Sequence, residues 1–155
     1  MLKDKKILIG VTGSIAACKV SGLVKLLEDR GAIVSVLSTE SGVRFLKTDK
    51  FTHINLGKDH DLILIAPCTA NTLSKIAHGI CDNLLTQVVL AAECPVVIAP
   101  AMNTKMLQNP LTQESIKKLK KSSYRVLETE DGMLACGDKG NGRMLSVLEI
   151  AEKIE

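Results

Sequence analysis

Short apolar runs alternate along the chain with longer segments in which apolar residues recur every three or four positions. Each short run is bounded by glycine, proline or charged residues, which favours a strand over a helix. Strands are expected at residues 6–10, 32–37, 61–66, 95–99 and 124–127. Helices are expected at residues 15–29, 70–78, 81–92, 112–121 and 145–154. This alternation predicts an α/β protein with an open, mostly parallel sheet and helices on both of its faces.

Length and composition narrow the class of protein. The 155 residues fit one domain, expected to span residues 1–155, and the 46% of hydrophobic residues supply a core. The apolar runs are too short to cross a bilayer or to serve as a signal peptide, so no membrane association is expected. Five cysteines without a Cys-x-x-Cys pair favour reduced thiols in the cytoplasm over a disulfide framework or a bound metal. A net charge of +3 with one Tyr, two Phe and no Trp disfavours nucleic-acid binding.

Small and hydroxyl-bearing residues follow the first two expected strands. Gly13 and Ser14 lie in the turn after the first strand, where backbone N–H groups and a hydroxyl would bind a phosphate. Ser41 follows the second strand and would bring another hydroxyl to the same edge of the sheet. The turn lacks Gly-x-Gly-x-x-Gly, and no acidic residue ends the second strand, so a mononucleotide fits better than NAD. A tight turn without a ligand is the alternative interpretation.

Polar side chains also follow the third and fourth expected strands. Thr69 is placed to cap a helix, and Asn71 carries both a hydrogen-bond donor and an acceptor, as needed to bind an imide or a carboxylate. Asn103 follows the next strand in the segment 100–103. Because ligands of open α/β sheets bind at the carboxyl ends of the strands, the two amides are expected to meet in one cleft.

Together these segments resemble the homo-oligomeric flavin-containing cysteine decarboxylases. The matching stretches are residues 10–19, 53–56, 66–86, 100–110 and 134–144. The resemblance implies a single Rossmann-like or flavodoxin-like domain that binds flavin mononucleotide (FMN). Within the family, the chain is similar to the carboxy-lyases that convert 4'-phosphopantothenoylcysteine to 4'-phosphopantetheine in coenzyme A biosynthesis. It also implies a homotrimer or an assembly of trimers.

The resemblance assigns a role to each matching residue. His53 would be the catalytic base and Cys136 the proton donor, carried by a mobile flap that covers the substrate. Asn103 would bind the substrate carboxylate. The other expected contacts are with FMN (Gly13, Ser14, Ser41, Thr69, Ala70, Asn71, Thr72, Ala101) and with the substrate (Met133, Ala135, Met144).

The chemistry of the two catalytic candidates agrees with those roles. Histidine, the residue at position 53, is the one amino acid whose side chain has an ordinary pKa suited to acid–base catalysis near neutrality. Cys136 lies among glycines and charged residues, so its thiol is expected to be accessible. Gly137, Gly140 and Gly142 would give the flap hinges. A surface histidine and a plain glycine-rich loop are the alternatives.

Two other functions remain to be weighed against the decarboxylation of 4'-phosphopantothenoylcysteine. Peptidyl-cysteine decarboxylases of lantibiotic maturation share the fold but lack the proton-donating cysteine, so Cys136 argues against them. Non-catalytic regulatory flavoproteins of the family carry acidic tails, and the 155 residues contain no acidic run of that kind, so a regulatory subunit is not expected. The chain departs from the family in one place, since the segment between Phe45 and His53 is shorter than the family's pattern.

Overall fold

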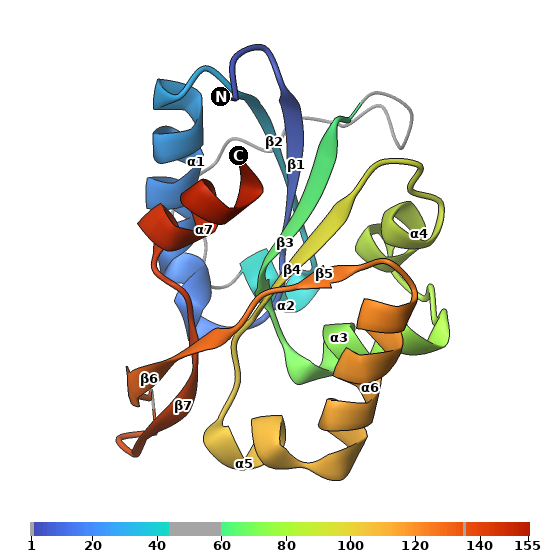
Figure 1. The fold of residues 1–155 in the computed structure, drawn as a ribbon, viewed down its shortest axis with the longest axis vertical. Coiled ribbons are helices and arrows are strands. Elements are labelled where there is room, and N and C mark those ends of the chain that lie inside the picture. The colour runs from blue at the N-terminus through green and yellow to red at the C-terminus, as the bar shows by residue number, and fades with distance from the viewer. Residues whose placement is uncertain (1, 44–59, 135) are drawn as a thin grey trace.

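The core of the molecule is a five-stranded parallel sheet (Figure 1). The computed structural model describes residues 2–43, 60–134 and 136–155. The strands are β1 (Lys6–Val11), β2 (Ile33–Ser38), β3 (Leu62–Cys68), β4 (Val96–Pro100) and β5 (Arg125–Val126). Their order is β2-β1-β3-β4-β5, the flavodoxin-like order, which confirms the predicted fold class.

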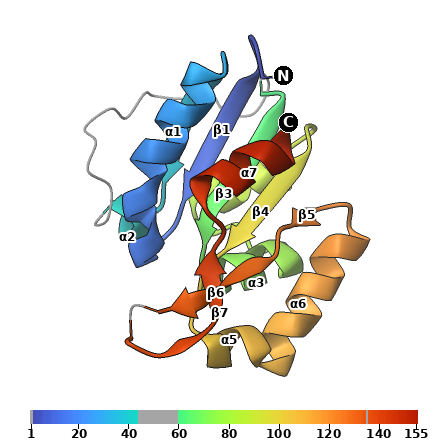
Figure 2. The ribbon, with the colours of Figure 1, turned by 60° about the vertical axis from the view of Figure 1, so that its left-hand side comes forward.

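Helices cover both faces because the central strands are apolar on both sides. Ile7 and Ile9 of β1 point into one buried cluster with α1 and α7, whereas Leu8 points into the other with α3, α4 and α6. Figure 2 shows α1 and α7 on one side of the sheet and α3 and α6 on the other. The helices are α1 (Val20–Asp29), α3 (Ala70–His78), α4 (Leu84–Leu90), α6 (Pro110–Lys121) and α7 (Val147–Ile154). Among the described residues, no helix is both long and apolar enough to span a membrane.

Capping side chains explain where the observed helices differ from the expected ones. The helix expected at 81–92 begins only at Leu84, because Asn83 and Thr86 form a reciprocal capping box at its start. The helix expected at 145–154 begins at Val147 for the same reason, with Ser146 as its cap. The segment expected as one helix at 15–29 starts as a 3₁₀ turn, η1 (Ile15–Lys19), and continues as α1.

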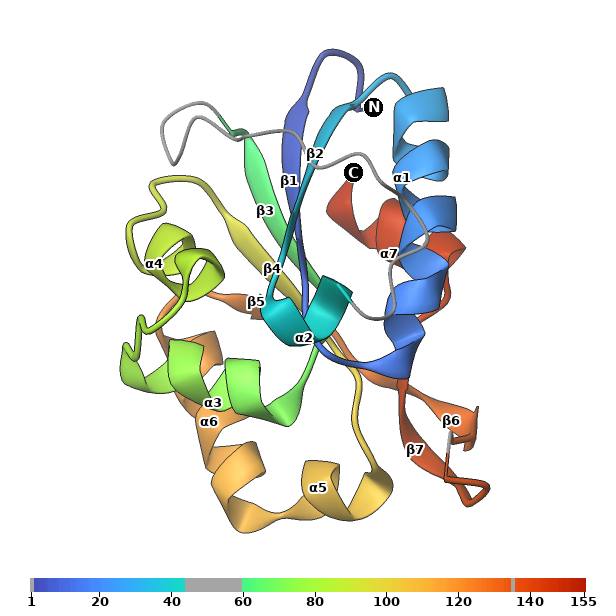
Figure 3. The same cartoon turned by 180° about the vertical axis from the view of Figure 1, so that it is seen from behind.

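The sequence did not predict three elements, and all of them flank the carboxyl edge of the sheet. They are the short helices α2 (Glu40–Val43) and α5 (Thr104–Gln108) and an antiparallel hairpin of β6 (Thr129–Met133) and β7 (Lys139–Met144). Figure 3 shows α2 beside the end of β2, with α5 and the hairpin beyond the same edge. Both chain termini lie at the opposite end of the sheet (Figure 1).

Candidate functional site

A buried threonine joins the two strand ends at which the strand order reverses. Thr12 follows β1, is 1% exposed, and donates a hydrogen bond from its hydroxyl to the carbonyl of Pro67 at 2.7 Å. The same hydroxyl accepts one from the N–H of Thr69 at 3.0 Å. Since β1 and β3 are neighbours in the sheet, Thr12 fixes the two loops across the point where α/β sheets bind their ligands. Sequence reasoning missed Thr12, although a threonine directly after a buried strand was the available signal.

Gly13 lets the backbone after β1 approach the start of α2 closely. A Cβ at Gly13 would lie 2.6 Å from both Cβ and Oγ of Ser41, so any larger residue would push the two loops apart. The hydroxyl of Ser14 accepts a hydrogen bond from the N–H of Ala16 at 3.3 Å and caps η1. Within the described residues, the N–H groups of Gly13 and Ile15 have no backbone acceptor. Backbone donors and two hydroxyls therefore gather where the sequence predicts a phosphate.

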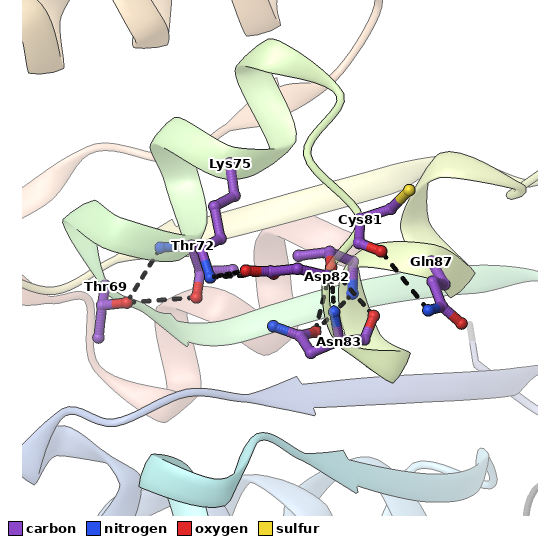
Figure 4. Close-up of polar contacts among 8 residues, drawn as sticks. Thr69, Thr72, Lys75, Cys81, Asp82, Asn83 and Gln87 are labelled. Carbon is purple, nitrogen blue, oxygen red and sulfur yellow. Dashed lines mark hydrogen bonds and ion pairs between the residues drawn. The ribbon is translucent and has the colours of Figure 1, made fainter.

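The first turn of α3 contains the four residues expected beside a flavin ring. Thr69 caps the helix by accepting from the N–H of Thr72 at 3.3 Å, and the Thr69 hydroxyl donates to the Thr72 hydroxyl (Figure 4). Thr72 is 3% exposed and its hydroxyl is engaged there, whereas the side chain of Asn71 is exposed. Asn71 and the half-buried Ala70 are thus better placed to meet a ligand than Thr72 is.

Beyond this turn, Lys75 of α3 contacts Asp82 before α4. The ammonium lies 2.7 Å from Oδ2 and 2.9 Å from Oδ1 of Asp82 (Figure 4). The hydrogen bond from Lys75 is the main cause that lowers the pKa of the Asp82 carboxyl. The pair ties the loop before α4 to α3, away from the cavity described next.

A cavity of about 480 Å³ opens between η1, the loop after β4 and the hairpin. Its volume lies within the roughly 300–1,000 Å³ of small-molecule sites. Six of the residues predicted from the sequence line it: Ser14, Ala101, Asn103, Met133, Cys136 and Met144. Gly13, Ser41 and the residues 69–72 of α3 are not among its described lining residues. Lys19, Met102 and Arg143 also line it and were missed, because their side chains converge only through the tertiary fold.

The amide of Asn103 and the thiol of Cys136 are in contact at the wall of this cavity. The Asn103 oxygen accepts from the N–H of Lys105 at 2.8 Å, which caps α5 and fixes the orientation of the amide. Its Nδ2 therefore faces the hairpin and donates to Cys136 Sγ at 3.4 Å. The thiol in turn donates to Oδ2 of Asp138 at 3.5 Å. An amide donor that can bind a carboxylate thus lies beside an exposed thiol that can donate a proton.

Glycines in the hairpin serve for close packing more than for hinges. The N–H of Met102 donates to the Gly142 carbonyl at 2.9 Å, and Thr104 Oγ1 donates to the Asn141 carbonyl at 2.5 Å. Gly142 has a φ of 137°, and a Cβ there would collide with the Met102 carbonyl oxygen. A Cβ at Gly140 would lie 2.5 Å from Thr104 Oγ1, whereas no heavy atom of the described residues lies within 4 Å of such a position at Gly137. Of the three expected hinges, two are contact points with the loop after β4.

Two expected site residues lie outside the described residues. These are His53, with the shortened segment before it, and Ala135. Their assigned roles stay predictions.

Two of the other cysteines, Cys68 and Cys94, contrast with Cys136 in their burial. Cys68 at the end of β3 is fully buried, and this burial raises the pKa of its thiol. Cys94 is half-buried, and desolvation raises its pKa as well. The described residues contain no group of three or more His, Cys, Asp or Glu placed to bind a metal ion. Cys136, by contrast, has a thiol that is exposed and that contacts the amide of Asn103 at the wall of the cavity.

The residues at this edge fit a flavin mononucleotide. The hydroxyls of Ser14 and Ser41, which the close approach at Gly13 brings together, and the backbone N–H groups of Gly13 and Ile15 suit its phosphate. Ala70 and Ala101 are small residues directly after the neighbouring strands β3 and β4, and Ala101 lines the cavity, which suits a planar ring at this edge.

Comparisons with known proteins point to the same chemistry. The model of a family described as Flavoprotein matches residues 1–155. The chain is 42% identical over 174 aligned residues to the probable phosphopantothenoylcysteine decarboxylase of Streptococcus mutans, with 97% of each protein covered. A solved PPC decarboxylase mutant complexed with pantothenoylaminoethenethiol is 30% identical, with a TM-score of 0.89 over 98% of this chain and 97% of that one. The FMN binding protein AtHal3 is 31% identical, with a TM-score of 0.85 over 98% of this chain and 95% of that one.

Proposed function

Because this chain belongs to the flavoprotein family, we propose that it is an FMN-dependent decarboxylase. Its substrate is 4'-phosphopantothenoylcysteine, and its product is the 4'-phosphopantetheine used in coenzyme A biosynthesis. The names of the Streptococcus mutans relative and of the solved PPC decarboxylase support this substrate. The contact of Asn103 with Cys136 in the cavity is the observation that carries the proposal, since it pairs a carboxylate-binding amide with a proton donor.

The loops at the carboxyl edge would hold the cofactor. Gly13, Ser14 and Ser41 would bind the phosphate of FMN, and Thr69, Ala70, Asn71, Thr72 and Ala101 would line its ring. Thr12, in the loop after β1, keeps the two sets of residues at a fixed spacing through its hydrogen bonds to Pro67 and Thr69 at the end of β3. When bound, FMN supplies reversible two-electron chemistry at the cysteine moiety of the substrate.

The chain itself supplies substrate binding and proton delivery. Asn103 Nδ2 would donate to the substrate carboxylate and so orient the bond to be cleaved. Met133, Ala135 and Met144 would flank the substrate, and Met133 and Met144 do line the cavity. After carbon dioxide leaves, the saturated product requires a proton on the enethiolate carbon together with the return of the two electrons that FMN would have accepted. The Cys136 thiol would donate it from the hairpin that covers the cavity.

Replacing Cys136 by serine tests this assignment. A hydroxyl is far less acidic than a thiol, so Cys136→Ser should still release carbon dioxide but stall before the last protonation. Mass spectrometry after incubation with 4'-phosphopantothenoylcysteine should then show the enethiol, two hydrogens lighter than 4'-phosphopantetheine. Cys81→Ser is the matched control, because Cys81 is exposed but lies outside the cavity. Normal formation of the saturated product by Cys136→Ser would show that Cys136 is a loop residue.

The same assay separates the two alternatives. A peptidyl-cysteine decarboxylase would act on a peptide with a C-terminal cysteine, stop at the enethiol and be indifferent to Cys136→Ser. A regulatory flavoprotein would bind FMN and release no carbon dioxide from either substrate.

His53 is proposed as the base on the strength of the family resemblance. His53→Asn should leave FMN absorbance intact and lower decarboxylation by about 10²–10⁴-fold, the usual cost of losing a general base. Turnover close to that of the unmodified protein would make His53 a structural residue.

We also propose one flavoprotein domain over residues 1–155, a homotrimer or an assembly of trimers, and a cytoplasmic location. The family match over residues 1–155 supports the first, and the family resemblance the second. The five unpaired cysteines are consistent with a reducing compartment. Light scattering of the purified protein measures the number of subunits.

A further inference from the structure

The cavity wall carries two cations that the proposed chemistry leaves unused. Lys19 at the end of η1 and Arg143 of β7 both line the cavity, and no Asp or Glu is among its described lining residues. Both side chains are half-buried, so each is partly withdrawn from water, and neither forms an ion pair with another described residue. Such an arrangement favours an anionic ligand.

Among the described residues, Arg143 forms no ion pair, because the carboxylate of its neighbour in the hairpin is hydrogen-bonded elsewhere. Glu130 lies directly opposite Arg143 in the register of β6 and β7. Its Oε1 accepts a hydrogen bond from the N–H of Ser146 at 2.7 Å, at the start of α7. The Arg143 side chain instead leans over Gly132, where an added Cβ would lie 2.8 Å from its Cδ. The guanidinium thus rests against bare backbone, and its charge stays available to the cavity.

Lys19 likewise forms no ion pair with another described residue. The ion pairs found in the described part of the chain join Lys5 to Asp61, Arg30 to Glu155 and Lys75 to Asp82. In η1, Ala17 packs into the core while Ile15, Ala16, Cys18 and Lys19 line the cavity. The ammonium of Lys19 is therefore carried by the cavity wall opposite the hairpin that bears Arg143.

We propose that Lys19 and Arg143 form a subsite for a phosphate monoester, that of the substrate 4'-phosphopantothenoylcysteine. This inference rests on the proposed function and adds the determinant of specificity for the phosphorylated substrate. Asn103 is already assigned to the substrate carboxylate at the reacting end. The two cations would therefore bind a second anionic group of the substrate. A phosphate monoester carries close to two negative charges and accepts the paired hydrogen bonds of a guanidinium.

Selectivity between two substrates tests the subsite. The assay measures kcat/KM for pantothenoylcysteine with and without its 4'-phosphate, using the FMN-loaded protein. Lys19→Gln and Arg143→Gln should each lower the ratio of the two values by about tenfold, the equivalent of one charge-assisted hydrogen bond. Arg143→Lys should restore part of the ratio, because it returns the charge without the fork of donors. Lys25→Gln is the matched control, since Lys25 is exposed on α1 outside the cavity.

The phosphate of FMN is the other source of the same chemistry, and a separate measurement distinguishes it. Fluorescence titration of the apoprotein gives the dissociation constants of FMN and of riboflavin for each variant. An unchanged substrate ratio with a lower preference for FMN over riboflavin would overturn the proposal and assign the two cations to the cofactor. An unchanged value of both ratios would overturn it as well.

Failure of the proposed function would look different. In that case the unmodified protein would decarboxylate neither form of pantothenoylcysteine. If it decarboxylates both forms and Lys19→Gln leaves their ratio intact, only the subsite is wrong.

Discussion

Gly142→Ala should detach the hairpin from the loop after β4 while leaving the sheet folded. Gly142 has a φ of 137°, which L-residues rarely adopt, and its Cβ would enter the space of the Met102 carbonyl. The hydrogen bond from the Met102 N–H to the Gly142 carbonyl, 2.9 Å long, depends on that close approach.

The energetic cost follows from these two contacts. Backbone strain of this kind costs about 1–3 kcal/mol, and a hydrogen bond contributes about 1 kcal/mol. Together they oppose docking of the hairpin by about 2–4 kcal/mol, which lowers the docked fraction relative to the undocked one by roughly 30-fold to 1,000-fold. Because Cys136 reaches Asn103 only when the hairpin is docked, formation of 4'-phosphopantetheine should fall by at least about tenfold.

Three measurements check this prediction. Product analysis by mass spectrometry gives the loss of the saturated product, and the rate of maleimide labelling reports the exposure of Cys136. Thermal unfolding shows whether the sheet is intact. Gly22→Ala on α1 is the control, because no atom of the described part of the chain lies within 4 Å of an added Cβ there. It should stabilise the protein by about 0.5–1 kcal/mol. A Gly142→Ala variant with unchanged product and unchanged labelling would refute the docking argument.

Two further predictions concern carboxylates. Asp138→Asn removes the anionic acceptor that orients the Cys136 thiol, so the share of enethiol among the released products should rise without a change in FMN affinity, and an unchanged share would assign Asp138 to the surface. The pKa of Asp82 is lowered in the folded protein by Lys75, so the contribution of this pair to stability is present at neutral pH and is lost as the pH falls through that lowered value. Urea unfolding of Asp82→Asn should therefore show a small loss of stability at pH 7 that disappears once the pH falls below the lowered pKa of Asp82.

The sequence predicts the sheet well because its strands are decided by local pattern. The runs around Ile7, Leu64 and Val97 are apolar on both faces and bounded by turn residues, as central parallel strands require. Helix starts are less certain, since the caps at Asn83 and Ser146 compete with helical propensity and move the first residue inward. The sequence predicts a glycine-rich flap in place of the hairpin. Glycine has a low propensity for β-strands, so the glycines that allow close contact here hide the two strands.

The candidate site was predictable only where one residue carries the chemistry by itself. Asn103 and Cys136 stand out by residue type and by the family resemblance, and the structure brings them into contact. Lys19 and Arg143 are ordinary charged residues in the sequence. The charge of Arg143 is available only because the Glu130 carboxylate accepts a hydrogen bond from the N–H of Ser146. That contact arises from the tertiary fold and cannot be predicted from the local sequence. Thr12 is likewise recognisable only once β1 and β3 are known to be neighbours.

The hairpin is anchored in the hydrophobic core at its base, whereas most of its described residues toward the tip are exposed. Met144 and Leu145, at its base, are 1% and 6% exposed and belong to the same buried cluster as Ala101, whereas Met133 is 63% exposed. Amide protons at the base should therefore exchange with solvent only when the whole domain unfolds, while those near Gly137 should exchange through local opening. Substrate would then enter by bending of the tip alone, and the wall that faces the cofactor would keep its shape through each turnover.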